Sequence, residues 1–290
     1  MKTIKLFCFG IGQVAKSFIS NLRKKNFNLD LTVTSREISK NDTIIDLDCK
    51  KFKFDMDNYD ANLLENLKNA EYVLVSIPPV NKKDIVIENF EKYFTSKLKW
   101  ITYLSATSVY GDHKGAWVDE NSKTNPTSEN GINRLNAEKL WIEKFKKNKL
   151  PIQIFRLSGI YSHENNILKR ILSGSAKIID KKDHFFSRVH VDDISNILLS
   201  TLTNFVPGEI YNISDDRPAS ADELVSYGSK LLGLDLPKKI KENEIESKML
   251  KDFYKESKKV NNKKIKNFLN YSFKYPSYIE GLNEIRKHII

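Results

Sequence analysis

The sequence predicts an α/β protein with a doubly wound parallel sheet and a smaller C-terminal lobe. Short apolar runs rich in branched and aromatic residues alternate with helical patterns, and a glycine-rich turn directly follows the first run. After about residue 160 the alternation loosens into helices with short strands. Near-continuous apolar strands separated by helices are typical of a parallel sheet covered on both faces. We therefore predict one domain over residues 1–160 and a mostly helical lobe over residues 161–290, from which some segments can return to the first domain.

Each predicted element rests on its own pattern. Five apolar runs predict the strands of the sheet, at residues 3–9, 29–34, 70–77, 99–105 and 151–157. The first helix places apolar side chains at helical spacing, at Val14, Ala15, Phe18, Ile19 and Leu22. Residues 128–141, SENGINRLNAEKLW, predict an amphipathic helix. One face of that helix carries Asn130, Arg134 and Glu138, and it is either the wall of a site or ordinary solvated surface.

Composition and charge indicate a globular protein and exclude several classes. The chain has 290 residues, of which 40% are hydrophobic and 29% charged, as in one large or two unequal soluble domains. The formal net charge of +11 comes from lysines scattered in short groups, which we interpret as a solvated surface. No apolar stretch approaches the length needed to cross a bilayer. We expect a small-molecule substrate, no nucleic-acid or membrane partner, and a monomer or homodimer.

The cysteines indicate the cellular compartment. Cys8 and Cys49 are too few for a disulfide framework or a cysteine zinc site, and Cys8 lies inside an apolar strand pattern. The N-terminal MKTIKLFCFGIG differs from a signal peptide, because Lys5 interrupts its apolar run. We therefore expect a cytoplasmic protein without a metal site.

The strongest local motif is GIGQVA, residues 10–15, which follows the first strand and opens the first helix. This is the context of a Rossmann dinucleotide-binding turn. Gly10 allows the tight turn and Gly12 lets the backbone approach a pyrophosphate, which then meets the helix N-terminus at Gln13 and Val14. The alternative is that the glycines merely turn the chain.

The choice of dinucleotide is read at the end of the second strand, where an acid suits NAD and a basic residue suits the extra phosphate of NADP. Asp30 falls at the start of that strand, and the strand ends in TSR without an acid. Arg36 offers a planar, permanently charged fork, and Ser35 adds a hydroxyl. We predict NADP, with NAD as the alternative in which Arg36 is a solvated loop residue.

Further motifs follow in order along the chain: LSATSVYG (104–111), RLSGIY (156–161), RVHVDDI (188–194), GEIYNISDDRPAS (208–220) and YPSYIEGL (275–282). Together with GIGQVA they resemble the extended short-chain dehydrogenase/reductases, the superfamily of NAD-dependent epimerases and dehydratases. The resemblance covers nearly the whole chain. It implies a Rossmann cofactor domain, a small substrate lobe and hydride transfer involving a hydroxylated substrate. It also implies cofactor contacts at Asp55, Ile77, Pro78, Ser105 and Ser158.

The catalytic set of that superfamily is incomplete here. When its YxxxK motif is aligned through Glu138, Asn130 stands at the tyrosine position and Arg134 at the lysine position, and the catalytic Ser or Thr falls on Ala106. An asparagine amide cannot act as a general acid or base near neutral pH, and Arg stays protonated. The sequence thus resembles the atypical branch of the superfamily. Arg134 can still hold the nicotinamide ribose, or it forms an i, i+4 pair with Glu138.

Substitute catalytic groups follow the strand at 99–105. Thr107 and Tyr110 are our candidates, although Tyr110 has packing as its alternative role. His113 and Trp117 lie in the adjoining loop. His190 and Asp192 look like a charge-relay pair, but we interpret HVDD as the start of a helix capped by an Asp.

The differences between this sequence and the superfamily pattern bear on its substrate and its activity. Nucleotide-sugar members of the superfamily usually carry an Arg four residues before the His of HV, where this chain has Phe186, and Arg188 stands in another register. A nucleotide-diphosphate sugar is therefore disfavoured. Two functions remain open: an NADP-dependent oxidoreductase or epimerase-like enzyme with an unconventional acid-base group, or a non-catalytic dinucleotide-binding sensor or regulatory protein.

Overall fold

The computed structural model describes residues 3–37, 49–179, 181, 184–246, 251 and 254–289. The chain divides into two compact, discontinuous units. The first unit comprises Met1–Ser105, Asn133–Arg156 and Ile194–Tyr211, and the second comprises Ala106–Ile132, Leu157–Asp193 and Asn212–Ile290. The division therefore alternates along the chain, with residues 106–132 grouped in the second unit and residues 194–211 in the first.

An eight-stranded sheet runs through the first unit in the order β12-β8-β6-β5-β1-β2-β3-β4. The predicted strands are confirmed as β1 (Ile4–Phe9), β2 (Leu29–Ser35), β5 (Tyr72–Val75), β6 (Trp100–Ala106) and β8 (Ile152–Leu157). β1 pairs in parallel with β2 and β5, and β5 pairs in parallel with β6. The carboxyl ends of these strands therefore share one edge of the sheet.

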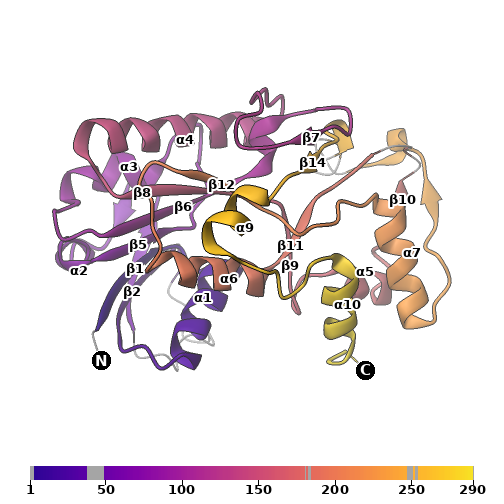
Figure 1. Cartoon of the computed structure of the whole chain (residues 1–290), viewed down its shortest axis with the longest axis horizontal. Helices are drawn as coiled ribbons and strands as arrows, with labels where there is room; N and C mark the ends of the chain where they lie inside the picture. The colour runs from indigo at the N-terminus through magenta and orange to yellow at the C-terminus, as the bar shows by residue number, and fades with distance from the viewer. Residues whose placement is uncertain are drawn as a thin grey trace. The chain divides into compact units, whose positions relative to one another are not determined.

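Helices cover both faces of this sheet, as the prediction of a doubly wound fold requires (Figure 1). On one face lie α1 (Gln13–Lys24) and α6 (Val191–Thr201), which are joined by hydrogen bonds from Asn21 to Ser195 and Asn196. The opposite face is covered by α2 (Leu63–Asn69), α3 (Ile85–Phe90) and α4 (Glu129–Asn148).

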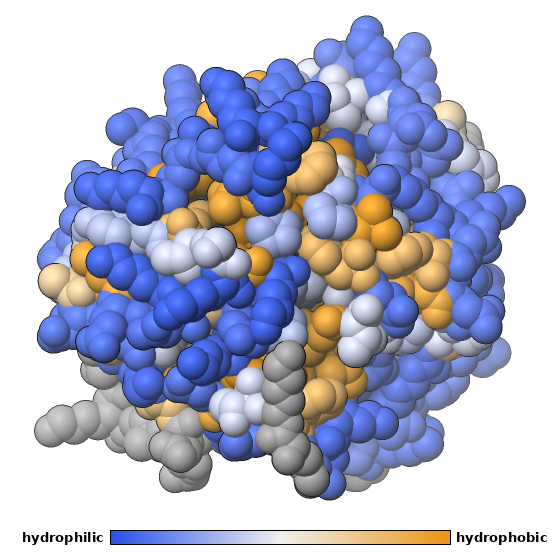
Figure 2. All heavy atoms as spheres, turned by 60° about the vertical axis from the view of Figure 1, so that its left-hand side comes forward, coloured by the Kyte–Doolittle hydropathy of each residue, from blue (hydrophilic) through white to orange (hydrophobic). Residues whose placement is uncertain are grey.

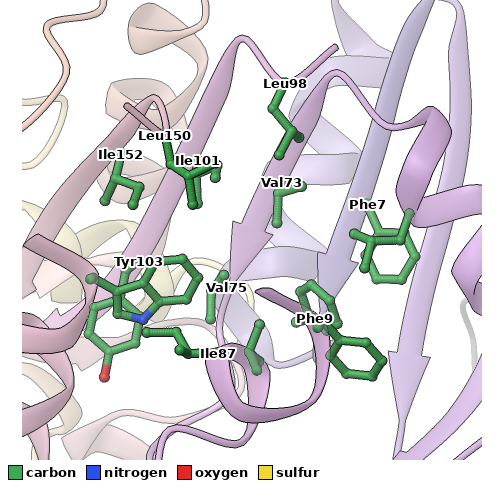
Figure 3. Packing of buried hydrophobic residues seen from close by; sticks show 14 of the residues in the cluster. Phe7, Phe9, Val73, Val75, Ile87, Leu98, Ile101, Tyr103, Leu150 and Ile152 are labelled. Atoms are coloured by element: carbon green, nitrogen blue, oxygen red, sulfur yellow. The ribbon is translucent and has the colours of Figure 1, made fainter. Parts of the chain in front are cut away.

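The main core lies between the sheet and α2, α3 and α4. Phe7, Phe9, Val73 and Tyr103 from the strands are buried there (Figure 3). Trp141 of α4 stacks on Tyr103 with the ring centroids 5.8 Å apart. Such aromatic contacts add to the burial of apolar area that stabilises the fold.

The strands at the two edges of the sheet were not predicted. β3 (Lys50–Asp55) reads KKFKFD and pairs in parallel with β2, and β4 (Asn58–Tyr59) returns antiparallel to β3. At the other edge, β12 (Ile210–Ile213) lies beside β8. Charged or short edge strands lack the continuous apolar pattern that identifies central ones.

The second unit is built from short elements. The described residues of this unit include the helices α5 (Ile167–Leu172), α7 (Ala221–Leu232), α9 (Lys263–Leu269) and α10 (Tyr278–Arg286). Two-stranded parallel sheets accompany these helices: β9 (Gly159–Tyr161) with β11 (Arg188–His190), β10 (Ile178–Ile179) with β13 (Lys239–Ile240), and β7 (Trp117–Val118) with β14 (Lys259–Val260). A buried cluster of Leu168, Val225 and Leu282 joins α5, α7 and α10.

The start of α6 differs from the prediction that an Asp caps it. The helix begins at Val191, and the Asp192 amide donates to Nδ1 of His190 over 3.1 Å. The buried Asp193 instead accepts hydrogen bonds from the Tyr271 hydroxyl and from two backbone amides. The predicted Asp cap is wrong, because the helix starts at Val191, two residues earlier than a cap at Asp192 requires, and the His190 ring supplies the acceptor.

The surface is largely hydrophilic on the face shown in Figure 2. Hydrophilic side chains cover most of the face shown in Figure 2, with hydrophobic side chains gathered in patches among them. Among the described residues, no helix is both long enough and apolar enough to cross a membrane.

Candidate functional site

The turn after β1 is held in place by two neighbouring strands. Gly10 has a φ of +86°, and its amide donates to Oγ1 of the buried Thr34 at 3.0 Å. The Ser76 hydroxyl, which follows β5, lies within hydrogen-bonding distance of the Phe9 and Gly10 carbonyls, at 3.0 and 3.1 Å. A Cβ on Gly10 would lie 2.8 Å from the Ser76 hydroxyl and 2.9 Å from Ile77. The turn therefore requires glycine for both backbone and space.

Gly12 has the opposite environment. It is the N-cap of α1 with an extended backbone, and a Cβ built on it meets no atom within 4 Å. No side chain caps α1, and its first turn, which begins with Gln13 and Val14, holds no acidic residue. An uncapped helix N-terminus with open space before it suits an anion, because the amides and the helix dipole both favour negative charge.

The end of β2 carries the groups predicted to select the dinucleotide. The Ser35 hydroxyl donates to the carbonyl of Glu37, and Arg36 is exposed. Asp30 lies at the start of β2, beside Lys5 of β1, and pairs with Lys50 at 3.0 Å. Asp30 is thus at the far edge of the sheet from Gly10, as the sequence indicated.

The other predicted contacts in the first unit follow strand ends. Asp55 is the exposed last residue of β3, while Ile77 and Pro78 follow β5. Only Ile77 is placed directly beside Gly10. Because parallel strands end at one edge, all three lie at the edge where ligands of open α/β sheets bind.

Ser105 belongs to a buried network that the sequence did not reveal. Its hydroxyl donates to Oε1 of Glu138 at 2.6 Å, and Arg156 donates to the same carboxylate from Nε at 3.1 Å and from Nη2 at 2.8 Å. All three side chains are buried. Glu138 therefore fixes α4 to β6 and β8, and it is not the exposed i, i+4 partner of Arg134.

The face of α4 thus changes character along its length. Asn130 is exposed, Arg134 is half-buried, and Glu138 is buried. Nη1 of Arg134 donates to the carbonyl of Leu104 in β6. This half of the helix face is consequently part of the wall over β6, and Arg134 presents a permanent charge there with several further donors.

The catalytic candidates lie in the second unit. Thr107 begins a 3₁₀ turn and is half-buried. Tyr110 ends that turn, is fully buried, and donates its hydroxyl to Oδ1 of Asn212 at 2.7 Å. This placement favours the packing role of Tyr110 over the catalytic one. Nε2 of His113 lies 3.2 Å from the Tyr110 carbonyl, and Trp117 is exposed.

Two further polar groups of the second unit are buried. Ser158 is 3% exposed, its amide donates to the Ile213 carbonyl at 3.0 Å, and its hydroxyl has no hydrogen-bond partner among the described residues. Burial lowers the pKa of His190 to about 4, although Asp192 opposes the shift. His190 is therefore neutral at physiological pH and acts as the acceptor at α6, without charge relay. The described part of the chain contains no group of His, Cys, Asp or Glu side chains that could hold a metal ion.

Comparison with known proteins gives structural matches only. No protein-family profile matches the sequence, and no curated protein does. A functionally unknown conserved protein from Silicibacter pomeroyi DSS has 30% sequence identity and a TM-score of 0.88, with 99% of each chain covered.

More distant structures share the fold. The dTDP-glucose 4,6-dehydratase from Bacillus anthracis str. Ames, in complex with NAD, is 17% identical with a TM-score of 0.80, and the match covers 99% of this chain and 96% of that one. The UDP-glucuronic acid 4-epimerase from Bacillus cereus, also in complex with NAD, is 19% identical with a TM-score of 0.79 over the full length of both chains.

Proposed function

We propose, on the premise that this chain belongs to the same family as the Silicibacter pomeroyi protein and has the extended short-chain dehydrogenase/reductase fold, that it binds NADP in preference to NAD and acts as an oxidoreductase or epimerase-like enzyme. The observation that carries the proposal is the open space in front of Gly12, at the uncapped N-terminus of α1. Backbone amides at such a position bind phosphate.

The fixed turn supports the proposal. Thr34 and Ser76 hold Gly10 from two sides, so the loop needs no rearrangement to accept a pyrophosphate. A preorganised loop loses less conformational entropy on binding than a mobile one. The dehydratase and the epimerase contain NAD, which supports a nicotinamide dinucleotide for this chain as well.

The preference for NADP rests on Arg36. It stands exposed at the end of β2, where the adenosine ribose of a bound dinucleotide would lie. The nearest acid within the strand, Asp30, is at its other end and is paired with Lys50. A guanidinium forms bidentate, charge-assisted hydrogen bonds with phosphate.

Chemistry at the nicotinamide would use few groups of this chain. The dinucleotide itself would accept or donate the hydride. Arg134 would hold the nicotinamide ribose through donors other than the one on Leu104. Thr107 has a half-buried hydroxyl and is our candidate for hydrogen bonding to the substrate oxygen.

A dinucleotide-binding protein without turnover is the second candidate, and one observation favours it. The Tyr110 hydroxyl is buried on Asn212, and the tyrosine position of α4 holds Asn130, so neither supplies a proton. The two functions are separable, because an enzyme oxidises NADPH in the presence of a substrate carbonyl whereas a sensor binds the cofactor without consuming it.

We expect Arg36→Ala to narrow the preference for NADPH over NADH. One charged phosphate contact is worth about 1.5–3 kcal/mol, so NADPH affinity falls at least several-fold while NADH affinity stays nearly constant. Titration calorimetry measures the dissociation constants for NADPH and for NADH. Equal affinities for NADPH and NADH in the unmodified protein would reject the assignment of Arg36.

We also expect Arg134→Ala to weaken NADPH binding, by about 1.5–3 kcal/mol for a charged hydrogen bond. Asn130→Ala is the matched control on the same helix, and it changes NADPH affinity far less, because the superfamily residue at its position addresses substrate. Calorimetric titration of both variants with NADPH measures these two affinities. Unchanged affinity in Arg134→Ala together with lost binding in Asn130→Ala would show that the alignment through Glu138 is wrong.

A further inference from the structure

The second unit contains a cavity of about 430 Å³ that no part of the cofactor proposal uses. Its walls come from α5, α7 and α10 and from the short sheets of β9 with β11 and β10 with β13. Apolar side chains form much of the lining, including Ile160, Ile167, Leu224 and Leu282. The volume lies within the range of cavities that bind small organic molecules.

One cation lies in the wall of this cavity. Arg188 of β11 is half-buried, and its side-chain hydrogen bonds to the described residues both come from Nη1, which donates to the carbonyls of Phe186 at 3.2 Å and Ala219 at 3.1 Å. The guanidinium carbon lies 5.7 Å from the centre of the Phe186 ring. Two carbonyls and an aromatic face therefore fix the orientation of the guanidinium.

The opposite edge of the Arg188 guanidinium remains for a ligand. The two hydrogens of Nη1 are used by the two carbonyls, and Nε and Nη2 make no hydrogen bond to the described residues. These two nitrogens form the edge that binds a carboxylate side-on. The same chain provides an internal example, because Arg156 holds the Glu138 carboxylate through its own Nε and Nη2.

The surrounding charges compensate Arg188 only in part. Burial lowers its pKa, and Asp215 is the largest influence in the other direction, but the described residues place no carboxylate within ion-pair distance of Arg188. Burial also raises the pKa of the Asp215 carboxyl well above its ordinary value. A guanidinium nevertheless stays protonated, so a partly desolvated positive charge faces the cavity and favours an anion.

The remaining polar lining limits the kind of anion. Arg170, Lys177 and Glu246 are exposed side chains of the lining, with charges of both signs. Arg188 is therefore the one cation of the described lining that is drawn out of solvent. One fork of this kind matches a single carboxylate, whereas a diphosphate would need several desolvated donors.

We infer that this cavity binds a small organic carboxylate with an apolar body. The carboxylate pairs with Nε and Nη2 of Arg188, and the body contacts the isoleucine and leucine side chains of α5, α7 and α10. The binding itself depends on the second unit alone. Its identification as the substrate class of the enzyme rests on the proposed function.

The test compares hydrocinnamate with hydrocinnamyl alcohol, which has the same apolar body without the charge. We expect calorimetric titration of the full chain, without dinucleotide, to give at least about tenfold tighter binding of the carboxylate. Arg188→Lys keeps the charge but loses the fork, and it should remove most of this difference. Leu224→Trp fills the cavity from α7 and should weaken both compounds without altering Arg188.

Arg217→Lys is the matched control. Arg217 also lies over an aromatic ring, that of Tyr278 at 5.6 Å, but it is exposed and does not line the cavity. Hydrocinnamate affinity should stay unchanged in this variant. Equal binding of the acid and the alcohol, wild-type affinity in Arg188→Lys, or stronger thermal stabilisation by UDP-glucose than by hydrocinnamate would each overturn the inference.

A separate NADPH titration of the same protein distinguishes the two proposals. Carboxylate binding without NADPH binding would support the cavity and reject the proposed function. NADPH binding without carboxylate binding would reject the carboxylate site in the cavity and leave the proposed cofactor binding in place.

Discussion

Gly12→Val is expected to give a folded protein that binds neither NADPH nor NADH. A Cβ at Gly12 meets no protein atom, and the residue has an extended backbone with φ −75°, so the valine fits the chain itself. Its side chain would occupy the space that a pyrophosphate needs in front of α1. Calorimetric titration should detect no binding of either cofactor, while the melting temperature stays close to that of the unmodified protein.

Gly10→Ala is the contrasting control. There the backbone has φ +86° and the added Cβ would lie 2.8 Å from the Ser76 hydroxyl, so this variant should lose stability as well as binding. Comparing Gly12→Val with Gly10→Ala separates loss of the space for the cofactor from loss of stability of the fold. Retained cofactor binding in a folded Gly12→Val protein would reject the phosphate site at this turn.

The second large effect is expected at Glu138. Glu138→Ala removes the carboxylate that pairs with Arg156 and accepts from Ser105, and it leaves a buried guanidinium without its partner. Breaking a buried ion pair from one side typically costs about 3–5 kcal/mol. Chemical denaturation should show a loss of this size in the free energy of unfolding.

Glu143→Ala is the matched control on the same helix, because Glu143 and Lys147 form an exposed pair at 2.7 Å. Screening by solvent makes such pairs weak, so the denaturation midpoint should scarcely move. Similar losses in Glu138→Ala and Glu143→Ala would show that burial does not make the Glu138 network important for stability.

The central sheet could be predicted from the sequence because its strands are buried on both faces. Every residue of β8 is buried, and the apolar Ile152, Ile154, Phe155 and Leu157 dominate the strand. β3 escaped prediction for the opposite reason, since only Phe54 of that strand is fully buried and charged residues occupy its exposed positions. The sequence feature that indicates β3 is the alternation of Lys and Phe in KKFKFD, because alternating polar and apolar residues are typical of a half-buried strand.

The candidate site divides in the same way between local and long-range features. The turn at Gly10 and Gly12 is encoded by adjacent residues, so the sequence predicted its position between β1 and α1. The network around Glu138 joins residues 33 and 18 positions apart, and only the folded sheet brings them together. Helical spacing alone suggested Arg134 as the partner of Glu138, because a helix pattern reveals only contacts between residues three or four positions apart.

The interleaving of the two units has a consequence for synthesis on the ribosome. The first unit is complete only after Tyr211 has emerged, and the second awaits its C-terminal segment, which supplies α10. Asp193 must wait for Tyr271, about eighty residues later, before its buried carboxylate gains that hydrogen bond. During translation, the apolar surface of α5 and α7 that α10 buries therefore stays uncovered until α10 has emerged, and we expect a product truncated before α10 to be a target for chaperones and proteases.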